Sequence, residues 1–390
     1  RRRHTRYPLV TGVQTCALPI YFLNRDQLEK TTVAEVQQVA LKYLVRNNRT
    51  VGIFEPLTAS ERISVPERPN LQGMLSDYTG RKPTSQGEQF DPSPKNIESR
   101  LVKGKLKTGV PFAMLPKKTK GETVSLTLNL RFGDEDSLRG KSTAVEALGS
   151  ALRMGTEKLD EQELNDRLDE LNANVAIQSA RQSLNISIET KRDKLIDALD
   201  VIRQILREPS FPADKFELYK EQALSELDSQ LQDPQALARL VVLRALNSYD
   251  RGDIRYESTI EEHIEDMKAL KLDDVKALHA NFLSGSEGEV AVVGDFDPAE
   301  VEEKLNAMLA NWKSSTPYQR AAVAPNVGFK APIKTVQTPD KANSVYFASQ
   351  QYALRDDDPN YAPLLMANYV LGGGTLSSRL GDRVRQKEGL

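Results

Sequence analysis

Residues 123–154 read TVSLTLNLRFGDEDSLRGKSTAVEALGSALRM and decide the fold. Apolar side chains occupy every second position from residue 124 to residue 132, which is typical of a β-strand with one buried face. After a polar loop, Val145, Leu148 and Leu152 recur at the spacing of an amphipathic helix over residues 141–154. The stretch therefore predicts a strand that is covered on one face by a helix.

The residues on either side extend this pattern into a sheet. Residues 101–115 alternate weakly around Lys107-Thr108-Gly109, which predicts a hairpin, and residues 174–190 alternate as two strands. Further helices are predicted at 160–171, 194–206, 216–231, 233–246, 300–312, 361–371 and 379–386, and further strands at 335–337 and 344–349. The order predicts an α+β fold with a mostly antiparallel sheet faced by helices on one side.

A helix–strand unit occurs twice in the chain. Thr32-Val33-Ala34-Glu35 has the form of a capping box and begins one helix, and residues 49–54 then predict a strand. The second unit begins at Leu272 and continues into a strand at 289–293. The matched pairs share one offset of 239 residues: Val36 with Val275, Tyr43 with Phe282, Leu44 with Leu283 and Val51 with Val290. The constant offset predicts duplicated domains, and the alternative is chance similarity between two amphipathic helices.

Composition excludes several classes of protein. The 390 residues carry a net charge of −2, and no run is long and apolar enough to span a membrane. Neither a nucleic-acid partner nor a membrane span is predicted. Residues 1–20, which hold the one cysteine, Cys16, resemble a translated sequencing adapter and are predicted to be non-native. The alternative for this segment is a disordered native N-terminus.

Four segments together resemble the pitrilysin/insulinase family of zinc metallopeptidases, of the LuxS/MPP-like fold type. Residues 131–164 resemble the strand and metal-binding helix of that family, and residues 208–227 resemble a later helix. GEVAVVGDFDPAEVEEKL, from Gly288 to Leu305, resembles the strand and helix that close each domain. LGGGTLSSRLGDRVRQKEGL, from Leu371 to Leu390, resembles the segment that precedes a substrate-binding tyrosine.

The resemblance implies a C-terminal, non-catalytic half with duplicated domains. Residues 21–60 correspond to the end of the second family domain, 61–96 to an interdomain linker, 97–325 to the degenerate third domain and 326–390 to a truncated start of the fourth. Catalytic members carry the zinc motif H-x-x-E-H, in which two histidines one turn apart reach one metal ion and the glutamate is the general base.

That motif is absent here. Its positions correspond to Glu146, Gly149 and Ser150, and Glu221 stands where the distant glutamate ligand would lie. A solvated charge on a helix is the favoured interpretation of Glu221. For His263, within EEHIED, a solvated acidic helix face is favoured over a metal cluster. We therefore predict no catalytic residue and no metal site in this chain.

The resemblance implies substrate contacts near the end of the chain. Arg385 corresponds to the family's arginine that binds the scissile peptide, since a guanidinium can donate two aligned hydrogen bonds. The alternative is one more exposed basic side chain. Gly372, Gly373 and Gly374 lack the spacing of a phosphate-binding loop, so a flexible turn that borders the peptide chamber is predicted. An edge strand of the sheet is a further candidate for binding extended peptides.

The resemblance implies a fragment of a zinc-dependent metalloendopeptidase, inactive by itself, that forms the substrate chamber and positions the peptide. Zinc would be held in the missing N-terminal half, which would be the partner beside peptide substrates. The alternative is a non-catalytic, peptide-binding partner subunit of a peptidase complex, and a third reading is a stand-alone peptide-binding module. A periplasmic location is suggested by the resemblance alone.

Overall fold

The computed structural model describes residues 23, 25–49, 85–327, 333–374 and 377–389. The chain divides into two compact units, Arg1–Thr84 and Ser85–Leu390. The adapter-like segment, most of the predicted strand at 49–54 and most of the predicted linker lie outside the described residues.

In the first unit, helix α2 (Val33–Tyr43) is followed by a short 3₁₀ turn, η1 (Arg46–Asn48). The capping box predicted from the sequence is present, because the Thr32 side chain accepts from the backbone N–H of Glu35 and the Glu35 carboxylate accepts from that of Thr32. No residue of α2 is buried.

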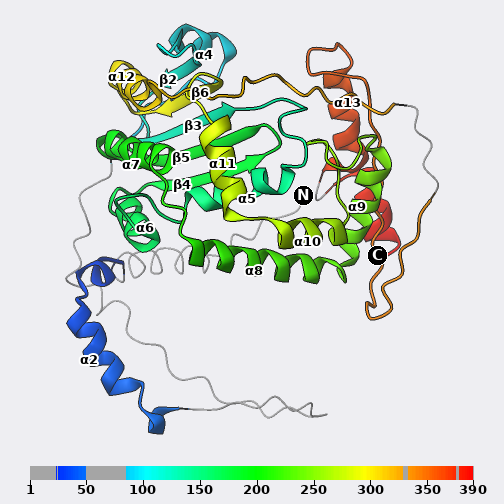
Figure 1. Cartoon of the computed structure of the whole chain (residues 1–390), viewed down its shortest axis with the longest axis horizontal. Coiled ribbons are helices and arrows are strands. Elements are labelled where there is room, and N and C mark those ends of the chain that lie inside the picture. The colour runs from blue at the N-terminus through cyan, green and yellow to red at the C-terminus, as the bar shows by residue number, and fades with distance from the viewer. Residues whose placement is uncertain (1–22, 24, 50–84, 328–332, 375–376, 390) are drawn as a thin grey trace, which may run out of the picture. The chain divides into compact units, whose positions relative to one another are not determined.

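The second unit is built around a six-stranded sheet with the order β1-β2-β6-β3-β5-β4 (Figure 1). Its strands are β1 (Val102–Lys105), β2 (Pro111–Pro116), β3 (Thr123–Arg131), β4 (Asn174–Ala180), β5 (Ser183–Lys191) and β6 (Gly288–Gly294). Only the β2–β6 pair is parallel, so the predicted mostly antiparallel sheet is confirmed.

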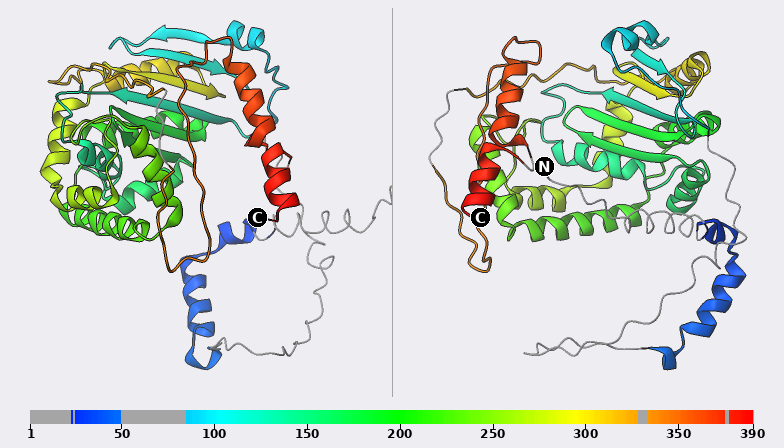
Figure 2. Two further views of the ribbon diagram at one scale, coloured as in Figure 1. Left: turned by 90° about the vertical axis from the view of Figure 1, so that its right-hand side faces the viewer. Right: turned by 180° about the vertical axis from the view of Figure 1, so that it is seen from behind.

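The alternation in β3 divides the sheet into a covered face and an open face. Val124, Leu126, Leu128 and Leu130 are each at most 1% exposed, whereas the residues between them are exposed or half-buried. β5 and β6 alternate in the same way. The helices between residues 142 and 282 lie on one side of the sheet (Figures 1 and 2), as the sequence predicts.

Three groups of helices make up the covered side. Helix α5 (Ser142–Leu152) contacts β4, and α11 (Leu272–Phe282) packs on α5. Helix α7 (Leu195–Arg207) contacts β5 and carries α6 (Glu161–Glu170) and α12 (Pro298–Leu309). Helices α8 (Ala213–Gln230) and α10 (Ile260–Ala269) pack on each other, and α9 (Pro234–Leu246) follows α8.

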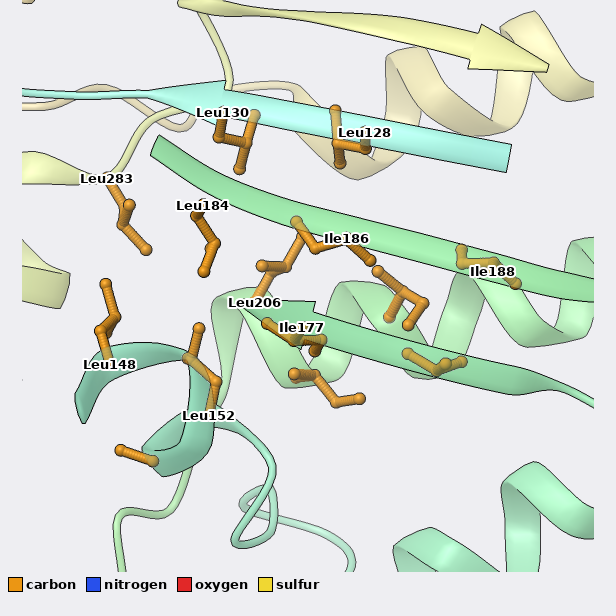
Figure 3. Packing of buried hydrophobic residues seen from close by; sticks show 14 of the residues in the cluster. Leu128, Leu130, Leu148, Leu152, Ile177, Leu184, Ile186, Ile188, Leu206 and Leu283 are labelled. Atoms are coloured by element: carbon orange, nitrogen blue, oxygen red, sulfur yellow. The ribbon is translucent and has the colours of Figure 1, made fainter. Parts of the chain in front are cut away.

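The core lies between the sheet and these helices. Leu148 and Leu152 of α5 face Ile177 of β4, while Leu184 and Ile186 of β5 lie alongside (Figure 3). This apolar contact holds α5 against the sheet.

Residues 85–96, at the end of the predicted linker, attach to the second unit. The backbone N–H of Glu88 donates to the Lys118 carbonyl at 3.0 Å, and helix α4 (Pro94–Arg100) contacts β2. The Arg100 guanidinium pairs with Glu88 and also donates to the Pro116 carbonyl.

Two predictions near the C-terminus are wrong. Residues 335–337 and 344–349 form no strand, and Tyr346 and Phe347 are exposed. Gly372 and Gly373 do not form a turn, because α13 (Tyr361–Asn368) continues through a π-helical turn, η3 (Tyr369–Gly373). A second helical stretch, α14 (Arg379–Gly381) and η4 (Asp382–Lys387), contains Arg385.

Candidate functional site

Helix α5 holds the three positions that correspond to the zinc motif, and each of them connects α5 to a different element. The Glu146 carboxylate lies 2.9 Å from Nε2 of His263 on α10. The two groups form an ion pair when the imidazole is protonated. This contact raises the pKa of the His263 imidazole, against the opposing effect of burial.

The contact with Glu146 corrects our interpretation of His263. The side chain is half-buried between α10 and α5 and does not lie on a solvated helix face. The acidic residues of EEHIED suggested a solvated face. Acidic side chains do lie near the imidazole, because Asp266 and Glu257 both add to the rise in its pKa.

Gly149 lies against the backbone of β4. A Cβ atom placed on it would come within 2.9 Å of the Ser179 nitrogen and 3.0 Å of the Ile177 carbonyl oxygen. The Gly149 N–H donates to the Ser179 hydroxyl at 2.7 Å, and that hydroxyl donates to the Val145 carbonyl. A catalytic glutamate at this position would therefore displace α5 from the sheet.

Ser150 faces the neighbouring helix α8. Ser150 is exposed, and its hydroxyl affects the pKa of the Tyr219 phenol. Burial raises the pKa of Tyr219 and the negative charge of Glu146 raises it further, while the Ser150 hydroxyl acts in the opposite direction. Glu221, two residues further along the same helix, is exposed, which agrees with its interpretation as a solvated charge.

These side chains do not fit a catalytic zinc ion. The three motif positions offer one carboxylate, one hydroxyl and a residue without a side chain, whereas a catalytic site needs three histidine, cysteine or carboxylate ligands. In the described part of the chain, no group of three or more such side chains could hold a metal ion. Among the helices that the structure describes, none is long and apolar enough to cross a bilayer.

Two cavities of about 520 Å³ lie at the two ends of α5. One is lined by Arg153, Asn165, Asp169 and Asn174 and opens beside β4. The other is lined by residues that include Arg139, Lys141, Arg251 and Asp274. Neither cavity is lined by the motif positions, which agrees with their role in helix packing.

The predicted substrate-binding residues lie on the last two helical stretches. Gly372 lies beside Leu380 of α14, so the glycine run packs on the start of the stretch that contains Arg385. Gly374 is buried, and a Cβ atom there would come within 2.6 Å of the Ser377 carbonyl oxygen. Arg385 itself is exposed.

A buried ion pair was missed by the sequence analysis. Arg255 and Asp253 are 9% and 7% exposed, and the guanidinium makes two hydrogen bonds to the carboxylate, of 2.8 and 2.7 Å. Arg255 also pairs with Glu135 and donates to the Ala322 carbonyl. These hydrogen bonds lower the pKa of Asp253. The pair connects three loops and has no feature of a catalytic site.

Comparison with known proteins identifies two family models that match different parts of the chain. The family model "Insulinase (Peptidase family M16)" matches residues 118–254, and the model "Peptidase M16 inactive domain" matches residues 269–390. Among curated proteins, the chain is similar to the "Non-peptidase homolog YmxG" of Helicobacter pylori, with 23% identity over 265 residues. The match covers 67% of this chain and 60% of that protein, so the chain spans less than two thirds of its relative.

Two solved structures are similar in fold. The peptidase M16 inactive domain from Pseudomonas fluorescens matches with a TM-score of 0.60 and 22% identity, over 74% of this chain and 68% of that one. A conserved protein from Enterococcus faecalis V583 matches with a TM-score of 0.54 and 20% identity, over 75% and 70% of the two chains. These likenesses confirm the predicted fold class.

Proposed function

Since the chain belongs to the M16, or insulinase, family of peptidases, we propose that it is a non-catalytic part of such a protein that binds extended peptides without cutting them. The observation that carries the proposal is that the three zinc-motif positions supply no ligand set for a metal. Gly149 packs against β4, while Glu146 and Ser150 are exposed and lie near His263 of α10 and Tyr219 of α8.

The open face of the sheet supports a role as the wall of a peptide chamber. In the middle of β3 and β5 it presents short polar side chains, namely Ser125, Thr127, Asn129, Asn185 and Ser187, while charged side chains stand toward the strand ends. Hydroxyl and amide groups can donate and accept hydrogen bonds with any peptide backbone, without selecting for charge. Such a surface suits a chamber that holds many different sequences.

The domain assignment remains part of the proposal. Residues 97–325 would be the degenerate third domain, 21–60 the end of the second, 61–96 the linker and 326–390 the start of the fourth. Arg385 and the glycines 372–374 would then contact the peptide from the fourth domain. In this arrangement a zinc ion, if the whole protein uses one, is held by a different part of that protein.

The second candidate function is a partner subunit that never contained a zinc site. The printed name of the Helicobacter pylori relative, a non-peptidase homolog, favours this alternative. Both candidates require peptide binding without cleavage by this chain. They differ only in whether the rest of the protein carries an H-x-x-E-H helix.

The test uses the whole 390-residue chain and a fluorescently labelled, permanently unfolded polypeptide such as carboxymethylated casein. We expect anisotropy to report binding and mass spectrometry to find the polypeptide intact after prolonged incubation with zinc. Arg385→Ala should weaken binding by about threefold or more, because a charge-assisted hydrogen bond is lost. Arg379→Ala, which changes an exposed arginine on the same helical stretch, is the matched control.

Cleavage that a chelator abolishes would contradict the non-catalytic assignment. Absence of binding to any unfolded polypeptide would contradict the chamber role. An equal loss of affinity in the two arginine variants would show that Arg385 has no specific role in binding. The polypeptide would then be attracted by positive charge in general.

A further inference from the structure

The sheet has two edge strands, β1 and β4, and the fold treats them differently. In β4 the two-residue turn between Ala180 and Ser183 sets the register, so residues 175, 177 and 179 direct their backbone groups away from β5. The Arg153 guanidinium donates to the Val175 carbonyl, and α5 lies against Ile177 and Ser179 through Gly149. The β4 edge is therefore covered by its own domain.

Among the described residues of the second unit, no element covers the β1 edge in this way. The Leu106 N–H donates to the Val110 carbonyl at 2.8 Å, so the hydrogen-bonded pairs of the hairpin are 106 with 110, 104 with 112 and 102 with 114. Lys103 and Lys105 consequently direct their backbone N–H and C=O groups outward. Within residues 85–327, β1 pairs with β2 alone, and no hydrogen bond between described residues uses these outward groups.

The charge of this edge restricts what can pair with it. Lys103, Lys105 and Lys107 are all exposed. Among the described residues, the one acidic side chain that forms an ion pair with any of them is Glu98, which lies 2.7 Å from Lys103. Two copies of the chain could not pair edge to edge without placing lysines opposite lysines. A strand that carries acidic side chains would bring opposite charges together instead.

We propose that the β1 edge is a docking site for an extended acidic peptide segment, which adds to the sheet as a seventh strand beyond β1. Backbone hydrogen bonds to Lys103 and Lys105 supply the register, and the ammonium groups of Lys103, Lys105 and Lys107 select carboxylate side chains. This surface is distinct from Arg385 and the glycine run, so the inference holds or fails independently of the proposed chamber.

The competing explanation is protective. Lysines on a free edge strand deter aggregation, because they make pairing with another edge unfavourable. Protection predicts that no peptide binds at this edge, whereas docking predicts a complex whose strength depends on both backbone geometry and charge.

The experiment measures binding of two labelled ten-residue peptides to the full chain by anisotropy at low salt. One peptide alternates valine with glutamate, and the other alternates valine with lysine. Lys103→Pro removes one outward N–H and leaves the hydrogen bonds between β1 and β2 intact, since proline is tolerated at an edge position. Lys103→Glu/Lys105→Glu reverses the charge, and Lys276→Glu, on the exposed side of α11, is the control for net charge. Thermal melts verify that each variant is folded.

We expect the glutamate peptide to bind the native chain and to lose at least about fivefold in affinity with Lys103→Pro. The doubly reversed variant should prefer the lysine peptide, while Lys276→Glu should bind as the native chain does. N-methylation of alternate peptide nitrogens should weaken binding as the proline variant does.

Three results would overturn the proposal. They are no binding of the glutamate peptide at low salt, binding that both β1 variants leave unchanged, and binding that follows charge alone without any effect of proline or N-methylation. The last result would identify ordinary electrostatic attraction instead of strand addition.

Discussion

Helices α2 and α11 have the same design and opposite environments. The structure places them at Val33–Tyr43 and Leu272–Phe282, so both boundaries differ by the offset of 239 that the sequence predicts. Each has an acidic residue in its first turn, Glu35 or Asp274, whose carboxylate accepts from the backbone N–H three residues earlier. Yet Val275 is 0% exposed and its counterpart Val36 is 57% exposed.

The difference between the two helices shows that the sequence of a helix determines its apolar face. Whether that face is buried depends on the element that packs against it. Helix α11 packs on α5, whose Val145, Leu148 and Leu152 are buried in the same core. Among the described residues of the first unit, α2 has no helix of that kind. The repeat therefore indicates that α2 is built to pack on a helix equivalent to α5, which agrees with the proposed domain duplication.

The largest effect should come from removing one apolar side chain at equivalent positions. Leu278→Ala in α11 should lower the free energy of unfolding by about 2–5 kcal/mol, because Leu278 is 1% exposed. Val39→Ala, its counterpart in α2, should change it by less than about 0.5 kcal/mol, since Val39 is 54% exposed. Urea unfolding of both variants measures the contrast. Similar losses would show that α2 is packed in solution.

A second substitution should reduce the difference between α11 and α2 by disturbing α5, the helix on which α11 packs. Gly149→Ala places a methyl group within about 3 Å of the β4 backbone and should cost roughly 1–3 kcal/mol of stability. Amide hydrogen exchange in α11 should become faster, toward the rate in α2. Thr143→Ala on the same helix is the control and should change stability by less than about 0.5 kcal/mol. A neutral effect of Gly149→Ala would mean that α5 can move away from β4 without cost.

The smallest effect concerns His279, which stands in α11 where α2 has Ala40. Its Nε2 lies 2.8 Å from the Leu206 carbonyl oxygen, and its ring meets Phe211 edge-on. Burial lowers the pKa of His279, the bond to Leu206 opposes this, and the nearby charge of Arg207 lowers the pKa further.

A folded-state pKa below that of the unfolded chain means that the unfolded chain binds more protons at acidic pH. Stability from this group is present above the unfolded pKa of about 6.5 and is lost as the pH falls below it. Between pH 7.5 and pH 5.5, the native chain should therefore lose more stability than His279→Gln. Parallel losses, measured by urea unfolding at both values, would contradict this assignment.

Local patterns account for most of the fold. Alternation predicts β3 from residues 123–132, and helical spacing predicts α5 from Val145, Leu148 and Leu152. Both predictions are possible because each element buries one face, and the apolar residues of that face recur at a regular interval in the sequence. Residues 344–349 have a strand pattern too, but a strand also needs a neighbour for its backbone groups. The described residues supply none, and the sequence alone could not reveal that.

The candidate site was less predictable. The sequence shows that Glu146, Gly149 and Ser150 lack the zinc motif, and it gives no information on what those residues contact instead. The ion pair with His263, the approach to Ile177 and the contact with Tyr219 depend on how α10, β4 and α8 pack around α5. Such contacts follow from tertiary structure, and no local period in the sequence signals them.

The zinc content of the purified 390-residue chain, measured by mass spectrometry after exhaustive dialysis, tests the central claim most directly. Because the three positions on α5 join it to its neighbours and hold no ligand set, we expect far less than one zinc ion per chain, with or without prior exposure to zinc. One tightly held equivalent that Glu146→Ala abolishes would contradict the account, since α5 would then bind metal as the catalytic helix of the family does.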